Sequence, residues 1–459
     1  MSTTNSASFP RRQLIAFVIF AALGVSVVQI VFYQMPNPEL DARRYIDYAL
    51  NIYDHQVFGL SGKSRDSAPQ PGNANSPLYP AFLALAMYFD DGLRDSLICT
   101  MEQGSNAPAI CPRDYSTITW AQLGLVVVAM AVLWTAAFWL FNRISIAWLS
   151  CLLTFATTKP MFFANNFLTE IFIVVFFPAL LLSVVGASRS GAKRWWLGAG
   201  VTIGLLTLTR PEYLYLAYSI TSIGIVVALL TKNLRFGISA LLLISSFSVV
   251  IAPWSIRNHQ QFRSFAVTGG YGDIIIAYRS AYNRMTFQEW AAAFVFWLPG
   301  HGEALAKQWL PASSYTRLGT DPKSYIYVEG KEIFDNGLAA VGGTRADLMS
   351  YLIKTEVLAH PLKHVATSIP LAWRGVLAGK YLAVVGLPCF AVLMIFAVRK
   401  RNTAILFISI PAIIMVGLYA AVSMSIPRYN VYLIYYYALA SAWLLVTLSS
   451  KNDPGRLLR

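Results

Sequence analysis

The chain has 459 residues, of which 56% are hydrophobic and only 13% are charged, and its mean hydropathy is +0.53. A soluble protein of this length would have helices with a charged face throughout, whereas this sequence contains long uncharged runs. We therefore interpret the chain as an integral membrane protein, all-α, with no separate soluble domain.

About ten segments are long and apolar enough to cross a bilayer, which takes roughly 20 residues in a helix. We place them near 13–33, 117–141, 144–160, 161–187, 195–210, 212–231, 236–254, 377–398, 403–424 and 430–449. The first segment is too long for a cleaved signal peptide, and no small-residue cleavage site follows it. We expect it to be retained as a span.

The basic residues of the short loops predict the orientation of the chain. With the N-terminus inside, 14 Lys and Arg but a single acid, Asp453, fall in inner segments, and the other 21 of the 22 acids fall outside. Nearly all of the net charge of +14 therefore reflects the orientation of the chain in the membrane. It does not favour nucleic-acid binding. Acid–base chemistry needs carboxylates, so we expect any chemistry at the outer face.

Two outer segments, 34–116 and 255–376, are too long to be simple turns. We expect a single polytopic membrane domain, 1–459, that includes both. Within the first segment, 41–58 and 76–89 have the apolar spacing of helices, and such helices would lie on the membrane surface. Ser76-Pro77 is typical of a capped helix start with Pro in the first turn.

The four cysteines divide between the outer segments and the spans. Cys99 and Cys111 both lie in the first outer segment, in an oxidising compartment, so a disulfide between them is the favoured prediction. The alternative is a pair of free thiols. Cys151 and Cys389 lie inside spans, where they are interpreted as small packing residues.

Six charges lie at the outer ends of predicted spans and so at one depth: Asp41, Glu170, Arg210, Glu212, Arg257 and Arg428. Charges at or within the bilayer are costly and are usually functional or mutually paired. The alternative for each residue alone is solvation at the interface. Six charges at matching depth favour one shared site.

The local sequences around these charges form an ordered set: Pro38–Ala49, Asn75–Leu85, Asn166–Glu170, Thr209–Glu212, Ala252–Asn258 and Pro427–Tyr429. This set resembles the GT-C membrane glycosyltransferases, above all the branch of protein O-mannosyltransferases, lipid A aminoarabinose transferases and related bacterial polyprenyl-phosphate-sugar transferases. The specific combination is Asp41 after the first span, then Pro77-Leu78-Tyr79-Pro80, then Trp254-x-x-Arg257-Asn258. Many relatives carry a second acid after the first Asp, where this chain has Ala42.

The resemblance implies a GT-C-like helical bundle in the bacterial plasma membrane, with its active site facing the periplasm. It implies that a sugar passes, with inversion, from a polyprenyl-phosphate carrier to an acceptor hydroxyl of a lipid, a polysaccharide or a protein. Asp41 would be the catalytic base; the alternative role of Asp41 is to cap the helix that it begins.

The predicted substrate-binding residues are Arg44, Tyr45, Glu170, Arg210, Glu212, Arg257, Asn258 and Arg428. Arg257 is the first choice for phosphate contact, because a planar guanidinium grips two oxygens at once; its alternative role is snorkelling at the interface. Glu170 and Glu212 are interpreted either as ligands of substrate or metal, as supports of Asp41, or as ion-pair partners of Arg210. No cofactor is required by the branch, and a divalent metal stays open.

The sequence has no P-loop and no Rossmann glycine fingerprint, which favours a lipid-linked donor over a nucleotide sugar. Three rival interpretations are a transporter or lipid flippase, a ligase that moves a preassembled glycan from a diphosphate-linked lipid, and a non-catalytic subunit. Transporters place broken helices and polar groups near mid-membrane in repeated halves, and this sequence does not.

Overall fold

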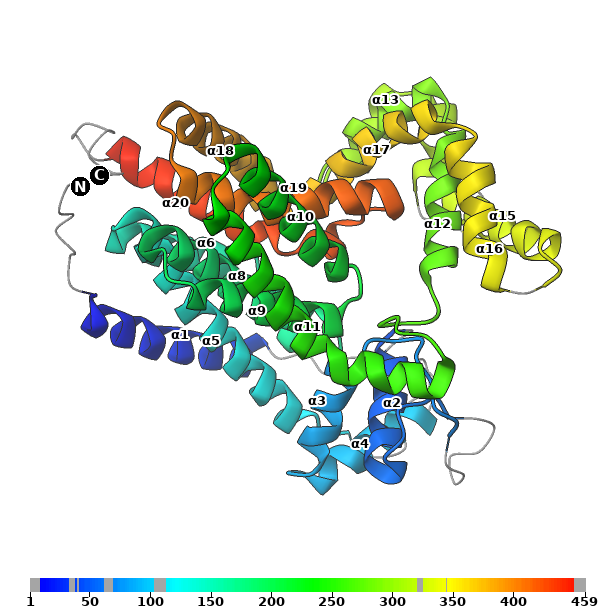
Figure 1. The fold of residues 1–459 in the computed structure, drawn as a ribbon, viewed down its shortest axis with the longest axis horizontal. Coiled ribbons are helices and arrows are strands. Elements are labelled where there is room, and N and C mark those ends of the chain that lie inside the picture. The colour runs from blue at the N-terminus through cyan, green and yellow to red at the C-terminus, as the bar shows by residue number, and fades with distance from the viewer. Residues whose placement is uncertain are drawn as a thin grey trace. The chain divides into compact units, whose positions relative to one another are not determined.

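The computed structural model of the protein describes residues 9–32, 38, 41–61, 69–102, 113–319, 325–343 and 345–449 (Figure 1). These residues are helical or irregular and contain no strand. The chain divides into two compact units. Unit 1 comprises residues 1–269, 388–410 and 435–459, and unit 2 comprises residues 270–387 and 411–434.

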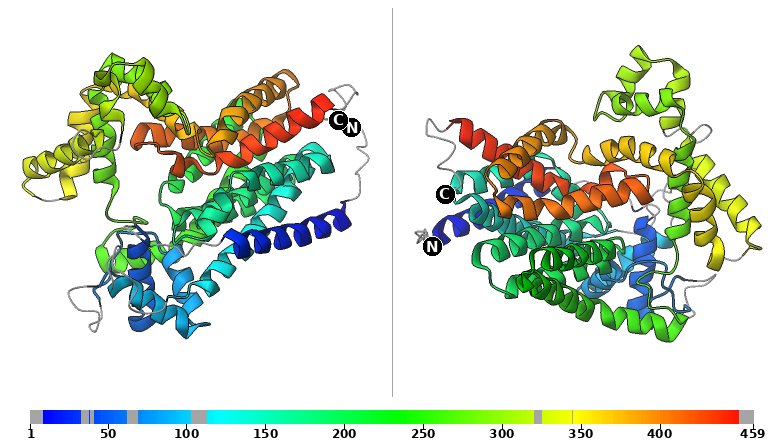
Figure 2. Two further views of the ribbon diagram at one scale, coloured as in Figure 1. Left: turned by 180° about the vertical axis from the view of Figure 1, so that it is seen from behind. Right: turned by 45° about the horizontal axis from the view of Figure 1, so that its top comes forward.

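Unit 1 holds the first eleven helices. They are α1 (Arg11–Phe32), α2 (Asp41–His55), α3 (Leu78–Met87), α4 (Asp91–Glu102), α5 (Ser116–Phe141), α6 (Ile144–Ala156), α7 (Lys159–Ala164), α8 (Glu170–Ser190), α9 (Arg194–Thr209), α10 (Tyr213–Thr231) and α11 (Leu234–Phe262). It also takes in parts of α18 (Tyr381–Arg399), α19 (Thr403–Val422) and α20 (Leu433–Ser449). Within the unit, α5 packs against α1, α6 and α8, and α9 packs against α8 and α11 (Figure 2).

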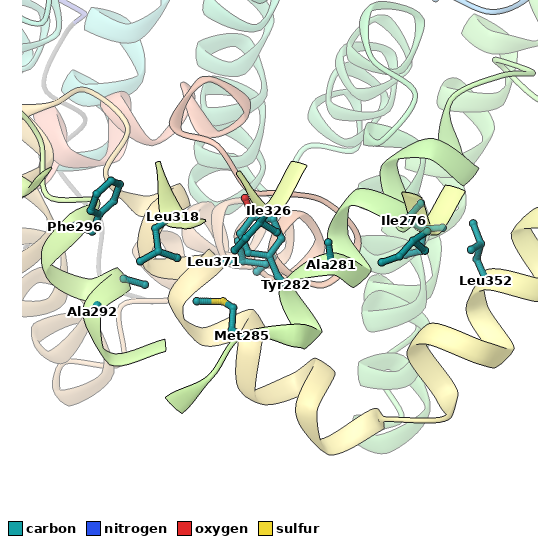
Figure 3. Close-up of a cluster of buried hydrophobic side chains, with 14 of the residues drawn as sticks. Ile276, Ala281, Tyr282, Met285, Ala292, Phe296, Leu318, Ile326, Leu352 and Leu371 are labelled. Carbon is teal, nitrogen blue, oxygen red and sulfur yellow. The ribbon is translucent and has the colours of Figure 1, made fainter. Parts of the chain in front are cut away.

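Unit 2 is built mainly from short helices. They are α12 (Gly272–Ala281), η1 (Tyr282–Arg284), α13 (Phe287–Phe296), α14 (Gly302–Trp309), η2 (Ala312–Ser314), η3 (Thr316–Leu318), α15 (Ile326–Ala340), α16 (Arg345–Leu352), η4 (Ile353–Leu358), α17 (Pro361–Val376) and η5 (Pro427–Asn430). Its core is a row of buried apolar side chains that includes Ile276, Tyr282, Phe296, Ile326 and Leu371 (Figure 3).

Seven described helices are long and apolar enough to cross a membrane: α1, α5, α8, α10, α11, α18 and α19. By length and composition the chain is a multi-pass membrane protein. All ten predicted segments are largely helical, but α6, α9 and α20 have only 13, 16 and 17 residues.

Two local predictions differ from the structure. The predicted segment 161–187 is divided between α7 and α8, because the chain leaves the helix between Ala164 and Glu170. The predicted helix at 76–89 begins at Leu78 with Pro77 as its N-cap and without a side-chain cap, so Ser76 does not cap it. The single-domain organisation stays a prediction.

A buried polar network in unit 2 satisfies the end of α19. The last carbonyls of a helix have no partner inside the helix. Arg279 Nε donates to Ala420 O at 2.8 Å, and His364 Nε2 lies 2.8 Å from Ala421 O. Asn283 Nδ2 lies 3.1 Å from His364 Nδ1. Because one ring nitrogen donates to a carbonyl, the other accepts from the amide, so this arrangement fits a neutral His364.

The pKa of His364 is lowered from 6.5 by burial and by the charge of Arg279, against the effect of the hydrogen bond with Ala421. The unfolded chain therefore binds the proton more readily than the folded chain does. Stability is then complete above pH 6.5 and is lost as the pH falls through the folded pKa.

We predict that the melting temperature of the purified protein falls less between pH 7 and pH 5 in His364→Gln than in wild type, since glutamine keeps one donor and one acceptor but does not titrate. Differential scanning fluorimetry across pH checks this. His360→Gln, an exposed position four residues earlier, is the control and should keep the wild-type slope. Equal slopes in all three proteins would contradict the prediction.

Candidate functional site

Three carboxylates and one guanidinium in unit 1 lie at helix ends of matching polarity. Asp41 and Glu170 are the first residues of α2 and α8, and Glu212 is the N-cap of α10. Arg210 is the C-cap of α9. The partial positive charge at a helix N-terminus favours a negatively charged side chain, and the partial negative charge at the C-terminus favours a positively charged one. Each of these charges is thus stabilised by its own helix.

Arg210 joins two of the carboxylates. Its Nη1 lies 3.1 Å from Glu170 Oε1, and its Nη2 lies 3.1 Å from Glu212 Oε1. The Glu170 side chain is fully buried, whereas those of Arg210 and Glu212 are 15% and 20% exposed. A buried charge is tolerated when it is paired and hydrogen-bonded. Several roles were left open for Glu170 and Glu212, and in the structure both are ion-pair partners of Arg210. Their contact with substrate stays a prediction.

Tyr45, one turn after Asp41 on α2, is close enough to Asp41, Glu170 and Arg210 to feel the charge of each. Burial raises the pKa of Tyr45, and the negative charges of Glu170 and Asp41 raise it further. Its side chain also hydrogen-bonds with Thr169. Tyr45 is therefore a neutral phenol that donates or accepts a hydrogen bond and does not act as a base. We call Asp41, Tyr45, Glu170, Arg210 and Glu212 the charged cluster.

Within the charged cluster, Asp41 is the exposed carboxylate. Its neighbour Arg43 donates to the carbonyls of Thr100 and Met101, at 2.8 and 2.7 Å, and so fixes the first turn of α2 against the end of α4. Arg44 is exposed on that same turn. The structure therefore presents a carboxylate and a guanidinium to solvent on a turn that is held in place.

Polar side chains inside apolar helices hold the break before Glu170. Gln122 Nε2 donates to Ala164 O at 2.8 Å, and Tyr79 OH donates to Gln122 Oε1 at 3.0 Å. The ring of Tyr79 packs edge-on against Tyr45 at 5.6 Å between centroids. Gln29 and Asn165 exchange two amide hydrogen bonds, both of 2.9 Å.

Gln29, Gln122 and Thr169 were not among the residues predicted from the sequence. The signal that could have found them is a polar residue within or beside an apolar run. Such a residue is expensive in a membrane unless it has a partner.

Trp254, Arg257 and Asn258 on α11 all donate to backbone carbonyls. Trp254 Nε1 donates to Val267 O at 2.7 Å, and Asn258 Nδ2 donates to Ala266 O at 2.8 Å. The guanidinium of Arg257 donates to Gly72 O at 2.7 Å and to Phe58 O at 3.1 Å, and it lies over the Trp254 ring. In this structure Arg257 fixes the chain that follows α2. Its contact with phosphate stays a prediction.

The remaining predicted residues are Arg428 and the four cysteines. Arg428 is half-buried in η5 of unit 2. Cys99 is buried in α4 and is disulfide-bonded, and Cys111 lies outside the described residues. Cys151 and Cys389 are free thiols. Among the residues that the structure describes, no group of three or more His, Cys, Asp or Glu side chains is placed to hold a metal ion.

Comparison with known proteins finds similarity only at the level of structure. No protein-family model matches the sequence, and no curated protein sequence does. The oligosaccharyltransferase AglB of Archaeoglobus fulgidus, in complex with an inhibitory peptide and a dolichol-phosphate, is 13% identical with a TM-score of 0.48, covering 97% of this chain and 53% of AglB. ArnT of Cupriavidus metallidurans, bound to undecaprenyl phosphate, is 12% identical with a TM-score of 0.41, covering 95% and 81%.

The chain thus spans about half of the length of AglB. The roles proposed below rest on the residues of this chain.

The Glu170–Arg210 pair gives a stability prediction. Arg210→Met should destabilise the protein by about 3–5 kcal/mol, because it leaves the Glu170 charge buried without its partner. Thermal melts in detergent check this, with Arg235→Met, an exposed site at the start of α11, as the control.

The double variant Arg210→Met with Glu170→Gln should melt above the Arg210→Met single variant, because it removes both charges. If Arg210→Met has the same melting temperature as wild type and as Arg235→Met, the ion pair contributes nothing to stability.

Proposed function

We propose that the protein is an inverting glycosyltransferase that moves a hexosyl or pentosyl group from a polyprenyl-phosphate carrier to an acceptor hydroxyl. The acceptor belongs to a lipid, a polysaccharide or a protein at the outer face of the bacterial plasma membrane. The observation that carries the proposal is the exposed carboxylate of Asp41 beside the buried Glu170–Arg210–Glu212 ion pairs, in a unit built from membrane-length apolar helices.

Asp41 is the proposed general base because it is the exposed acid of the charged cluster. Glu170 is fully buried and Glu212 is four-fifths buried, and both contact the guanidinium. Tyr45 is held neutral by burial and by its acidic neighbours, which raise its pKa. Asp41 combines exposure with a position at the first residue of a helix.

The proposed reaction is one displacement at the anomeric carbon. The acceptor oxygen forms a bond to this carbon as its proton passes to the Asp41 carboxylate. The bond from the anomeric carbon to the phosphate oxygen breaks, and its electron pair leaves with the polyprenyl phosphate. Attack from the face opposite the leaving group inverts the configuration, so the base and the phosphate lie on opposite sides of the sugar.

A cation must hold the leaving phosphate, and Arg44 is the proposed candidate within unit 1. It is exposed on the turn of α2 that begins with Asp41. A guanidinium on a long side chain can reach past the sugar to the phosphate and grip two of its oxygens. Arg210, Arg257 and Arg428 stay in the proposal as further phosphate contacts.

The proposed placement at the outer face rests on how unit 1 sorts its charges. The carboxylates of the charged cluster meet at one end of the helices. Basic residues follow the opposite helix ends, where Arg189 Nη1 donates to Trp139 O at 2.9 Å and so joins the end of α8 to the end of α5. Basic loops tend to stay on the cytoplasmic side of a membrane, and this tendency supports an outer position for the charged cluster.

The experiment is sugar transfer by membranes supplied with a panel of radiolabelled polyprenyl-phosphate sugars. Asp41→Asn should lower transfer by about 10²–10⁴-fold at equal protein level, because the acceptor proton loses its base. Asp54→Asn makes the same change on the same helix, at a surface pair with Arg94, and should transfer like wild type.

Full transfer by Asp41→Asn would overturn Asp41 as the base. Transfer by none of the donors would overturn the proposed reaction and favour a ligase, a transporter or a non-catalytic subunit. Loss of transfer in both variants would assign the effect to α2 as a whole and contradict a specific role for Asp41.

A further inference from the structure

Helix α17 of unit 2 is built with its polar side inward. Its buried face carries His364 and Thr367, which join the network around Arg279. Its opposite face carries Leu362, Val365 and Ile369, which are 85%, 65% and 53% exposed. Leu358, just before the helix, is 63% exposed. Steps of three and four residues place Leu362, Val365 and Ile369 along one stripe of α17.

Helix α13 extends this apolar stripe. The indole of Trp290 donates to Ala366 O at 2.8 Å, which fixes α13 beside α17. Phe287 is 80% exposed, and its ring stacks on Trp290. We call Phe287, Leu358, Leu362, Val365 and Ile369 the α13–α17 apolar face.

This face requires an apolar environment. Burying one such side chain fully is worth roughly 1.5–3 kcal/mol relative to water. Isolated exposed apolar residues are ordinary, but five on one contiguous face mark an interaction surface. The inward polar side of α17 already has its hydrogen-bond partners. A rotation of α17 that buried the apolar residues would break these hydrogen bonds.

Two features of unit 2 identify lipid as the occupant. Exposed basic residues lie close in sequence to the stripe: Arg284 ends η1, Lys354 lies on η4 and Lys363 lies on α17. The carboxylate on these three elements, Glu356, is half-buried. Apolar residues flanked by Lys and Arg are the pattern of a helix that lies in the headgroup region.

The second feature is the connection to a membrane-length helix. α17 ends at Val376 and α18, a candidate span, begins at Tyr381. The four residues between them span at most about 14 Å even when fully extended. The end of α17 is therefore tethered close to the depth at which α18 enters the bilayer.

We propose that the α13–α17 apolar face lies in the lipid–water interface, with its apolar side chains among acyl chains and with Arg284, Lys354 and Lys363 against anionic headgroup phosphates. This surface anchors unit 2 to the bilayer and is independent of the proposed sugar transfer. The sequence analysis had assigned surface helices only to the first outer segment.

A nitroxide at Leu362→Cys tests the proposal in the full chain, in a Cys151→Ala, Cys389→Ala background that removes the free thiols. The protein is reconstituted in nanodiscs, and collision of the label with oxygen and with a water-soluble nickel chelate is measured by power saturation. At Leu362→Cys the label should collide more with oxygen than with the nickel chelate. It should collide more with the chelate at Lys331→Cys, the exposed control on α15 of the same unit.

Nickel access at Leu362→Cys equal to that of the control would overturn the proposal in favour of a face exposed to water. Protection from both reagents would overturn it in favour of a protein partner or a second copy. In nanodiscs of phosphatidylcholine with phosphatidylglycerol, the label should shift further toward oxygen than in phosphatidylcholine alone. Lys354→Gln with Lys363→Gln should abolish that difference; a difference that persists would overturn the headgroup contact.

Discussion

The structure depends on one constraint, the inability of hydrocarbon to solvate an ion. Unit 1 meets it by placing Asp41, Glu170, Arg210 and Glu212 at the ends of helices, where each charge suits the local helix dipole. Glu170, the fully buried carboxylate of this set, is paired with Arg210. Asp41 is exposed beside this pair. The exposure of Asp41, in a cluster whose other two acids are fully or mostly buried, is what supports a chemical role for the site.

The same constraint governs the groups that are not charged. Gln29, Gln122 and Asn165 lie in or beside apolar helices, and each finds an amide or carbonyl partner that shapes the chain before Glu170. In unit 2, α17 has polar side chains facing inward, where they are hydrogen-bonded, and apolar side chains facing outward. The proposed transfer from a lipid-linked donor calls for both a held ionic site and contact with lipid.

Apolar run length was enough to predict the membrane-length helices. Of the six end charges predicted to share one site, Glu170 and Glu212 contact Arg210, whereas Arg257 contacts backbone carbonyls. Three features were beyond such patterns. The run at 161–187 looks continuous, and its break depends on Gln29 and Gln122, which are remote in sequence. The partners of Arg257 are carbonyls of Phe58 and Gly72, set by tertiary folding. The inward polar face of α17 reads as an ordinary amphipathic helix until Arg279 is placed beside it.

The central claim is that the protein recognises a sugar carrier of the polyprenyl monophosphate class. Native mass spectrometry of the purified full chain, titrated with polyprenyl monophosphate and with polyprenyl diphosphate, tests it most directly. The account predicts one bound monophosphate per chain, retained in preference to the diphosphate and weakened by Arg44→Gln. Preference for the diphosphate would contradict the account in favour of a ligase, and retention of neither lipid would contradict a polyprenyl-linked donor altogether.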